Sequence, residues 1–471
     1  MAYTTIDNPE LYFQTKLYTG NGGTQSITLD GSENMQPDWT WIKSRGDTSN
    51  HRVYDSVRGA TKVVYTNLTN VEGTDTNGLT SFDSDGFSLG TEGQSNGSGV
   101  NFASWNWLAG GTAPAITYTV KVVSDSGNKY RFDDFGTSAV TLDLQEGGTY
   151  TFDQSDSSNA GHPLRFSTTS NGTHGGGSEY TTGVTTNGTP GSSGAYTRIT
   201  VAASAPQLYY YCSVHSLMGG SANTNSTFGS SNFSGSIQST VSAGSTQGFS
   251  IVIWQGSGAD AQIGHGLSSA PEMYVVKNRD DSADWRVGQT VAGNTMTGGN
   301  GYYMEWNDTK ASTNPGSATT WGSTPTAPTS SVFTVGSNNA HNGSSDDMLA
   351  YCFHSVKGYS RISSYVGNGS TSGTFVYTGF RVRYVMIKRV SAGGNSWRLY
   401  DNLRDIDNEM DNALFITNAV EGNYDAIDFL SNGFKLRGTS AAINGSGSTY
   451  IFYAIAENPL VTSKGIPSNA K

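Results

Sequence analysis

The fold of this chain is decided by residues 383–388, RYVMIK, which lead through a polar turn into residues 397–401, WRLYD. The same pattern recurs at residues 272–277, EMYVVK, before 285–288, WRVG, and at residues 38–43, DWTWIK, before 51–55, HRVYD. In each copy an aromatic and β-branched run ends in Lys, and His or Trp followed by Arg starts the next run. Short apolar runs divided by a polar turn predict paired strands. Such self-similarity predicts one β-unit that is written three times.

The segments on either side of this pattern also repeat. The lead-in at residues 17–22, LYTGNG, is similar to 364–369, SYVGNG, and residues 252–256, VIWQG, are a weaker copy. The segment at 81–89, SFDSDGFSL, is similar to 428–436, DFLSNGFKL. An apolar run closes each copy, at residues 102–108, 348–353 and 450–456. This layout predicts an all-β chain of three β-sandwich repeats with a jelly-roll or lectin-like architecture.

Composition agrees with an all-β, folded chain. Charged residues are only 14% of the sequence, whereas it holds 25 Tyr, 19 Phe and 9 Trp, the reverse of a disordered composition. The net charge of −11 argues against a nucleic-acid partner, because the phosphate backbone attracts basic surfaces. No apolar run approaches the roughly 18 residues of a membrane helix, so we expect no membrane insertion. The start, Met1-Ala2-Tyr3, has no basic region before an apolar core, which predicts synthesis in the cytoplasm without a signal peptide.

Composition and repeats together predict four domains. We place the first β-sandwich repeat at residues 1–113, an inserted domain at 114–222, the second repeat at 236–361, and the third repeat with a C-terminal tail at 362–471. Stretches rich in Gly, Ser, Thr and Asn, at 221–235 and 311–330, predict long loops or linkers.

The inserted domain carries four side chains that suit a soft metal. His162 follows an early strand, and Cys212, His215 and Met218 follow the aromatic run at 209–211 with two residues between successive members. A thiolate and two imidazoles form a trigonal site, and a thioether adds a weak axial bond, which suits copper in both oxidation states. Residues 115–222 resemble the cupredoxins, the blue-copper family, in the order of these four residues. The resemblance implies a Greek-key β-barrel and copper as the cofactor, with His162, Cys212, His215 and Met218 as metal ligands.

The alternative to a metal site is a purely structural role for the inserted domain. The domain could be a structural module without metal, in which Cys212 is a small buried side chain. Cys352 and His354 resemble a second metal pair, but Cys352 lies on a closing strand and we expect it in the core. His174 stands in a Gly-rich loop, where we expect it to be exposed.

Two other polar motifs favour structure over binding. Asp83 and Asp85 have the spacing of calcium ligands, but the third repeat has Leu430 and Asn432 there, so the preserved feature is a hairpin turn. The pair Asp55 and Arg58 recurs as Asp401 and Arg404, and we interpret it as an ion pair within the fold instead of a sugar-binding site.

No catalytic template is recognisable. The alternating acidic motif of lectin-like glycosidases is absent, as are a Gly-x-Ser-x-Gly elbow and a Walker-type phosphate loop. We therefore predict no catalytic residues, no binding residues for an organic cofactor, and no enzyme activity.

The first repeat also carries a resemblance. Its segments 17–22, 36–43, 58–60 and 81–87 resemble repeats in structural proteins of marine bacteriophages, including cyanophages, and such proteins also carry segments similar to 211–215, YCSVH. This resemblance implies a virion component, such as a tail fibre, a tail-associated protein or a capsid surface protein, located in the particle. It implies other virion proteins as partners, a homo-oligomer, and adhesion to a host surface glycan or protein. The alternatives are a copper-binding electron-transfer protein and a depolymerase of host polysaccharide.

Overall fold

The computed structural model describes residues 3–225, 227–293, 295–296, 301–314, 320–417 and 420–467. The chain is all-β, as the sequence predicts. Helical turns are short and interrupt the strands at Pro9–Leu11 (η1), Gly93–Asn96 (α1), Ser157–Asn159 (η2), Gly172–Gly175 (η3) and Asn339–Asn342 (α2). Among the described residues, no helix has the length and apolarity that crossing a membrane would require.

The three repeated segments share one strand order, and we call them unit 1 (3–113), unit 2 (227–359) and unit 3 (360–467). In each unit the lead-in strand pairs with the closing strand, which pairs with the Lys-ended strand, which pairs with the next strand. In unit 1 these are β1 (Phe13–Thr19), β9 (Asn101–Trp107), β3 (Trp39–Ser44) and β4 (Arg52–Asp55), extended by β5 (Lys62–Tyr65) and β6 (Gly73–Thr74).

The equivalent sheets of the other units keep this order. Unit 2 follows it with β22 (Phe249–Gln255), β28 (Asp347–Phe353), β24 (Met273–Asn278), β25 (Arg286–Gln289) and β26 (Met304–Glu305), preceded at the edge by β20 (Ser230–Asn232) and β21 (Ser239–Gly244). Unit 3 follows it with β29 (Ser360–Val366), β36 (Thr449–Pro459), β31 (Phe380–Arg389), β32 (Arg398–Asp401) and β33 (Met410–Phe415). The domain boundaries themselves stay predictions.

A second layer of strands covers one face of each large sheet. It consists of β2 (Gln25–Thr28), β8 (Gly86–Leu89) and β7 (Leu79–Asp83) in unit 1, and of β23 (Ala261–Gly264) and β27 (Val332–Val335) in unit 2. In unit 3 the equivalent strands, β34 (Gly422–Leu430), β35 (Gly433–Leu436) and β30 (Phe375–Tyr377), continue the large sheet. This eight-stranded sheet is nearly closed, and Thr374 Oγ1 donates to Val366 O at 3.0 Å between its two end strands.

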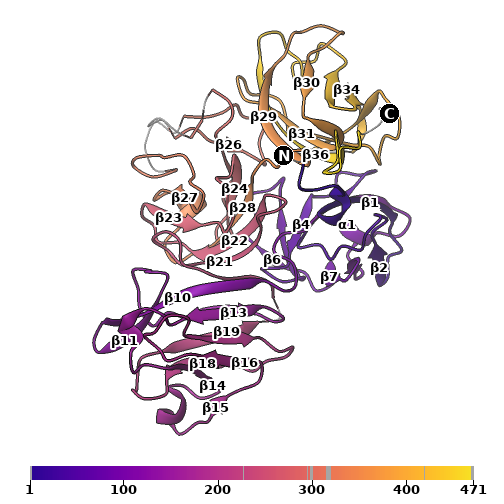
Figure 1. The fold of residues 1–471 in the computed structure, drawn as a ribbon. Coiled ribbons are helices and arrows are strands. Elements are labelled where there is room, and N and C mark those ends of the chain that lie inside the picture. The colour runs from indigo at the N-terminus through magenta and orange to yellow at the C-terminus, as the bar shows by residue number, and fades with distance from the viewer. Residues whose placement is uncertain are drawn as a thin grey trace.

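The opposite faces of the three large sheets meet in one aromatic core. The ring of Trp39 in unit 1 lies 4.8 Å from that of Tyr351 in unit 2, and Phe353 lies 5.0 Å from Tyr453 of unit 3. Phe13 of unit 1 contacts unit 3, with its ring 5.5 Å from that of Tyr384. Units 1, 2 and 3 are therefore grouped around a common centre, with the inserted domain below them (Figure 1). Because each large sheet is covered on both faces, every residue of the central strands β3 and β24 is buried.

The His or Trp that starts the second strand of each motif joins the units in a cycle. Each ring nitrogen hydrogen bonds a main-chain carbonyl of another unit, through His51 Nε2 and Phe415 O at 2.8 Å, Trp285 Nε1 and Tyr65 O at 2.8 Å, and Trp397 Nε1 and Glu305 O at 3.0 Å. His51 also accepts from Trp41 Nε1 through its Nδ1 at 3.0 Å, so Nε2 carries the proton. These bonds fix the order of the units around the centre.

The repeated Asp–Arg pair is buried and structural. Arg58 Nε donates to Asp55 Oδ2 at 2.6 Å, and its Nη1 donates to Glu72, which also binds Arg279 of unit 2. Asp55 accepts from the Tyr351 hydroxyl of unit 2 at 2.8 Å. The equivalent set around Asp401 and Arg404 takes in Glu421 and, from unit 1, Arg45 and Trp105. The Asp–Arg pair thus links units, and its buried partners favour a structural role over sugar binding.

The acidic turn of unit 1 also has the predicted structural role. Asp83 pairs with Gly86 across a two-residue hairpin turn, and Gly86 has φ of +113°. The Asp83 carboxylate accepts from the Ser81 and Ser88 hydroxyls, each at 2.7 Å, and Asp85 accepts from Met35 N. These bonds account for both carboxylates without a calcium ion.

The inserted domain is a sandwich of two five-stranded sheets around its own core. One sheet has the order β11 (Asn128–Phe132), β10 (Ala115–Ser124), β13 (Thr149–Asp153), β17 (Tyr196–Thr200) and β16 (Val184–Asn187). The other has the order β12 (Leu142–Gln145), β19 (Gly220–Asn225), β18 (Leu208–Cys212), β14 (Leu164–Ser167) and β15 (Glu179–Tyr180).

The linker predicted at residues 221–235 is wrong, because strands β19 and β20 occupy most of it. The polar residues of β20 within this stretch bind unit 2 to the inserted domain. Ser231 accepts from the Tyr118 hydroxyl through its carbonyl at 2.7 Å, and its Oγ accepts from Asp143 N at 2.8 Å. Thr240 Oγ1 donates to Asp143 Oδ2 at 2.6 Å. Of the second predicted loop, 311–330, residues 315–319 lie outside the described residues, and the remainder contains no regular strand.

Candidate metal centre

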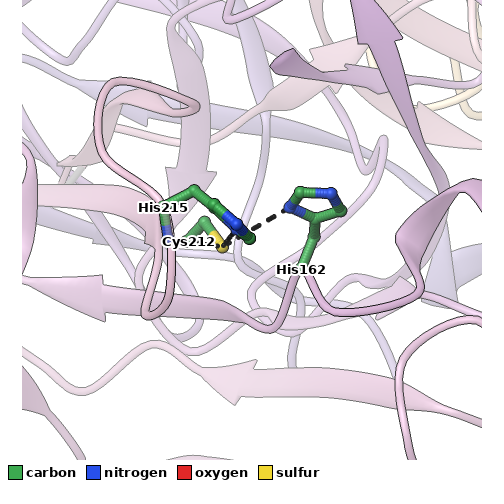
Figure 2. Close-up of side chains that lie close together, drawn as sticks. All are labelled: His162, Cys212 and His215. Carbon is green, nitrogen blue, oxygen red and sulfur yellow. Dashed lines mark hydrogen bonds between the residues drawn. The ribbon is translucent and has the colours of Figure 1, made fainter.

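Strand pairing brings the predicted ligands together. Cys212 is the last residue of β18, and its partner across the ladder is Leu164 at the start of β14. His162 precedes Leu164 by two residues, so it reaches the end of the strand that carries Cys212. His215 stands three residues after Cys212, on the turn toward β19. Figure 2 shows the two imidazoles close to each other beside the thiol, with ring centres 4.5 Å apart.

The three side chains form a compact cluster. Cys212 Sγ lies 3.9 Å from His162 Nδ1 and 3.9 Å from His215 Nδ1, and one ligand atom from each of the three residues lies within 4.8 Å of those of the other two. The main-chain N–H of His215 donates to Sγ at 3.4 Å. Cys212 is buried, His162 is half-buried and His215 is exposed, so the cluster lies at the surface end of the domain.

Met218 lies beside this cluster. Its side chain is 1% exposed within the core of the inserted domain, and it lines the same open cleft of about 450 Å³ as His215. Its main-chain carbonyl accepts from Tyr130 N at 3.0 Å. The structure thus brings His162, Cys212 and His215 together and places Met218 in the adjoining cleft.

Neighbouring groups hold the His162 loop. The His162 carbonyl accepts from the Tyr130 hydroxyl at 2.8 Å and from Gln154 Nε2 at 2.9 Å. Burial and the nearby Cys212 raise the pKa of Tyr130, which keeps its hydroxyl protonated as a donor. Partial burial, followed by the proximity of His215, lowers the pKa of His162. A neutral imidazole is the form that ligates metals.

Sequence reasoning missed two side chains that support the site. His174 is exposed, as predicted, but its Nε2 also lies 3.1 Å from the carbonyl of Cys212. Asn171 Oδ1 accepts from Leu217 N at 2.7 Å, which fixes the loop between His215 and Met218. Both belong to a Gly-rich loop that follows β14, and no motif in the sequence indicates which of its side chains faces the site.

Cys352 and His354 do not form a metal pair. Cys352 is fully buried on β28 in the core of unit 2, and burial raises the pKa of its thiol. His354 Nδ1 lies 2.9 Å from Ala270 O. The core position that the sequence predicts for Cys352 is confirmed.

The donor types and the two S···N separations fit one soft metal ion. Ligand atoms bound at about 2.0–2.3 Å from a single ion lie no more than about 4.4 Å apart, and the two S···N separations of 3.9 Å satisfy that limit. A thiol with two imidazoles and a neighbouring thioether selects copper or another thiophilic ion over calcium and magnesium, which prefer oxygen ligands.

The repeat scaffold and the metal centre differ in how they compare with known proteins. Residues 8–141 and 221–459 match a domain of unknown function, DUF7483. The match skips residues 142–220, so all four candidate ligands lie outside it. No curated protein and no solved structure matches the chain. Since the matched segments make up well over half of the sequence, the chain belongs to the DUF7483 family.

Proposed function

We propose that the chain is a structural component of a virus particle, a tail fibre, tail-associated or capsid surface protein that adheres to the host and catalyses no reaction. The observation that carries this proposal is the single aromatic core shared by units 1, 2 and 3. A rigid scaffold of this kind leaves its outer loops free to vary and to bind. The resemblance of the first repeat to phage structural proteins supplies the virion location, the virion partners and the homo-oligomeric state.

The side chains of the repeat motifs support a structural role over a depolymerase. Glycoside hydrolysis needs two carboxyl groups that face each other across a substrate site. Asp55 and Asp401 are buried and bound by Arg58 and Arg404, and Glu72 and Glu421 complete the same ion pairs between units. The carboxylates that recur between the repeats are therefore engaged in buried ion pairs.

Mass spectrometry of purified particles tests the virion assignment. We expect peptides of this chain at a copy number matching a symmetric structural ring or fibre, with antibody labelling at the particle surface. Its absence from purified, infectious particles would contradict the assignment.

A second proposal, that the inserted domain binds copper, stands on the His162, Cys212 and His215 cluster. His162, Cys212 and His215 would hold the ion, with Met218 as the weak fourth ligand. Copper would supply one-electron redox chemistry. Tyr130, Gln154 and His174 hold the main chain of His162 and Cys212 in place, and the exposed His215 forms the solvent edge of the site. Metal analysis after exposure to copper tests the proposal, with one ion per chain expected.

A further inference from the structure

Unit 3 carries exposed aromatic side chains, two of which share one strand. Among the described residues the exposed large aromatic side chains are Phe375, Tyr377 and Tyr424, with exposures of 45%, 47% and 47%. Phe375 and Tyr377 are two apart on β30, so they share its outer face, whereas Val376 between them is buried. Val366, 55% exposed at the end of β29, lies beside them, because Thr374 Oγ1 donates to its carbonyl. We call Val366, Phe375 and Tyr377 the seam platform.

The other two units show that the fold does not require apolar residues here. Val376 pairs with Phe434, as Ile27 pairs with Phe87 in unit 1 and Ile263 with Phe333 in unit 2. By this register, the positions of Phe375 and Tyr377 hold Ser26 and Thr28 in unit 1, and Gln262 and Gly264 in unit 2. The lead-in motif places Thr19 and Gln255 at the position of Val366. Three apolar residues at outward positions that are polar or Gly elsewhere indicate a contact with something outside the chain.

Two cations adjoin the platform. Tyr377 lines an open cleft of about 640 Å³ together with Tyr3, Lys357 and Arg361. The Arg361 guanidinium lies 5.6 Å from the centre of the Tyr377 ring, and Lys357 Nζ lies 4.7 Å from that of Tyr3. Within the described residues, neither cation forms an ion pair with a carboxylate. The aligned positions in unit 1 are Glu10 for Lys357 and Gln14 for Arg361, so the basic character belongs to unit 3.

The remaining wall of the cleft is mixed, with polar side chains beside the apolar Val291 and Ile362. Ser355, Ser363 and Thr378 line it, as does Glu272, whose carboxylate lies 3.6 Å from His354 Nδ1 and accepts from Ser355 N. A sugar ring has an apolar face that packs on aromatic rings and a rim of hydroxyls that needs hydrogen-bonding partners. Guanidinium and ammonium groups pair with carboxylate and sulfate. An aromatic strip that ends in a cleft with both features suits a saccharide better than a flat protein surface.

We propose that the seam platform and its cleft bind an anionic saccharide, a chain of sugars that bears carboxylate or sulfate groups. Its rings would pack on Phe375 and Tyr377, and its anionic groups would pair with Arg361 and Lys357. This inference rests on the adhesive role proposed above and names the class of surface ligand. The net charge of −11 disfavours non-specific retention of polyanions, so retention reports on this local site.

The experiment uses the full purified chain, a heparin hexasaccharide as the anionic probe and maltohexaose as the neutral one, with affinities from calorimetry. The key variant is Phe375→Ser with Tyr377→Thr, which copies unit 1 and should keep the fold. We expect it to weaken binding of the anionic probe at least about tenfold. Arg361→Gln, which also copies unit 1, should lower the preference for the anionic over the neutral probe. Tyr424→Ser, a matched exposed aromatic on β34, should change neither.

Three outcomes would overturn the inference. They are no binding of the anionic probe by the unaltered chain, unchanged binding by the double variant, and a double variant that alters only the oligomeric state. The last would identify the platform as an interface between copies of this chain. Thermal unfolding confirms that each variant is folded. The binding experiment uses the purified chain, so a failure to bind the saccharide would not contradict the virion assignment. Absence of the chain from particles, in turn, would not contradict saccharide binding.

Discussion

The imidazole of His51 shows how the shared core fixes the protonation state of a buried side chain. His51 is fully buried between Trp41 and the carbonyl of Phe415, and burial lowers its pKa well below the ordinary 6.5. The folded chain keeps this ring neutral, whereas the unfolded chain takes up a proton below pH 6.5. Acid therefore favours unfolding, and the stability contributed by neutral His51 is fully present above pH 6.5.

We expect the free energy of unfolding to fall by about 1.4 kcal/mol per pH unit below pH 6.5 on account of His51 alone. His51→Gln removes that slope, and at pH 7.5 it costs about 1–3 kcal/mol because a buried partner is lost. Urea unfolding of both chains at pH 7.5, 6.0 and 5.0 measures the difference in slope. Equal slopes in the two chains would show that His51 does not titrate as proposed.

Cys212 permits an equally local test of the metal centre. Cys212→Ser removes the thiolate, so we expect loss of stoichiometric copper and of the strong visible absorption that a copper–thiolate bond produces. Cys352→Ser is the matched control, because it alters the other cysteine of the chain, which lies in the core of unit 2. Titration with copper followed by absorption spectroscopy distinguishes them. Unchanged copper binding by Cys212→Ser would refute the site.

At the scale of elements, the hairpin that carries Asp55 depends on a buried ion pair. Asp55→Ala leaves the buried Arg58 with Glu72 as its remaining carboxylate partner. We expect the free energy of unfolding to fall by about 3–5 kcal/mol. The control, Asp30→Ala, removes a carboxylate that is 71% exposed and paired with Lys16, and it should cost no more than about 1 kcal/mol. Denaturant unfolding compares the two variants. Similar losses of unfolding free energy in the two variants would mean that burial does not strengthen the pair of Asp55 and Arg58.

Elements differed in how far the sequence could predict them. The Lys-ended strands and the Asp85–Gly86 turn were predictable, because local pattern and turn chemistry determine them. Strand β20 was not, since its polar residues serve the contact with the inserted domain and read as a linker. The candidate ligands were found from type and order, but His174 was not, because its contact is with a main-chain carbonyl.

At the scale of the whole molecule, the sequence could show three copies but not that they share a core. Residues of β3 face a second layer of strands on one side, and those of β31 face β34 and β35 of their own nearly closed sheet. The other side of each strand faces the common centre, so the apolar pattern is the same as that of an isolated buried strand. Tyr351 and Tyr384 belong to different units and give no local sign of their partners, Trp39 and Phe13. Sharing a core makes the stability of each unit depend on the others.

The most direct test of this shared core is hydrogen–deuterium exchange of Trp39→Ala, read by mass spectrometry. Trp39 is 1% exposed and contacts aromatic rings of units 1 and 2, and its loss should cost about 3–5 kcal/mol. We expect faster exchange in β3, β24 and β31 together, while β13 of the inserted domain, which has its own core, stays protected. Faster exchange confined to unit 1 would contradict the shared core.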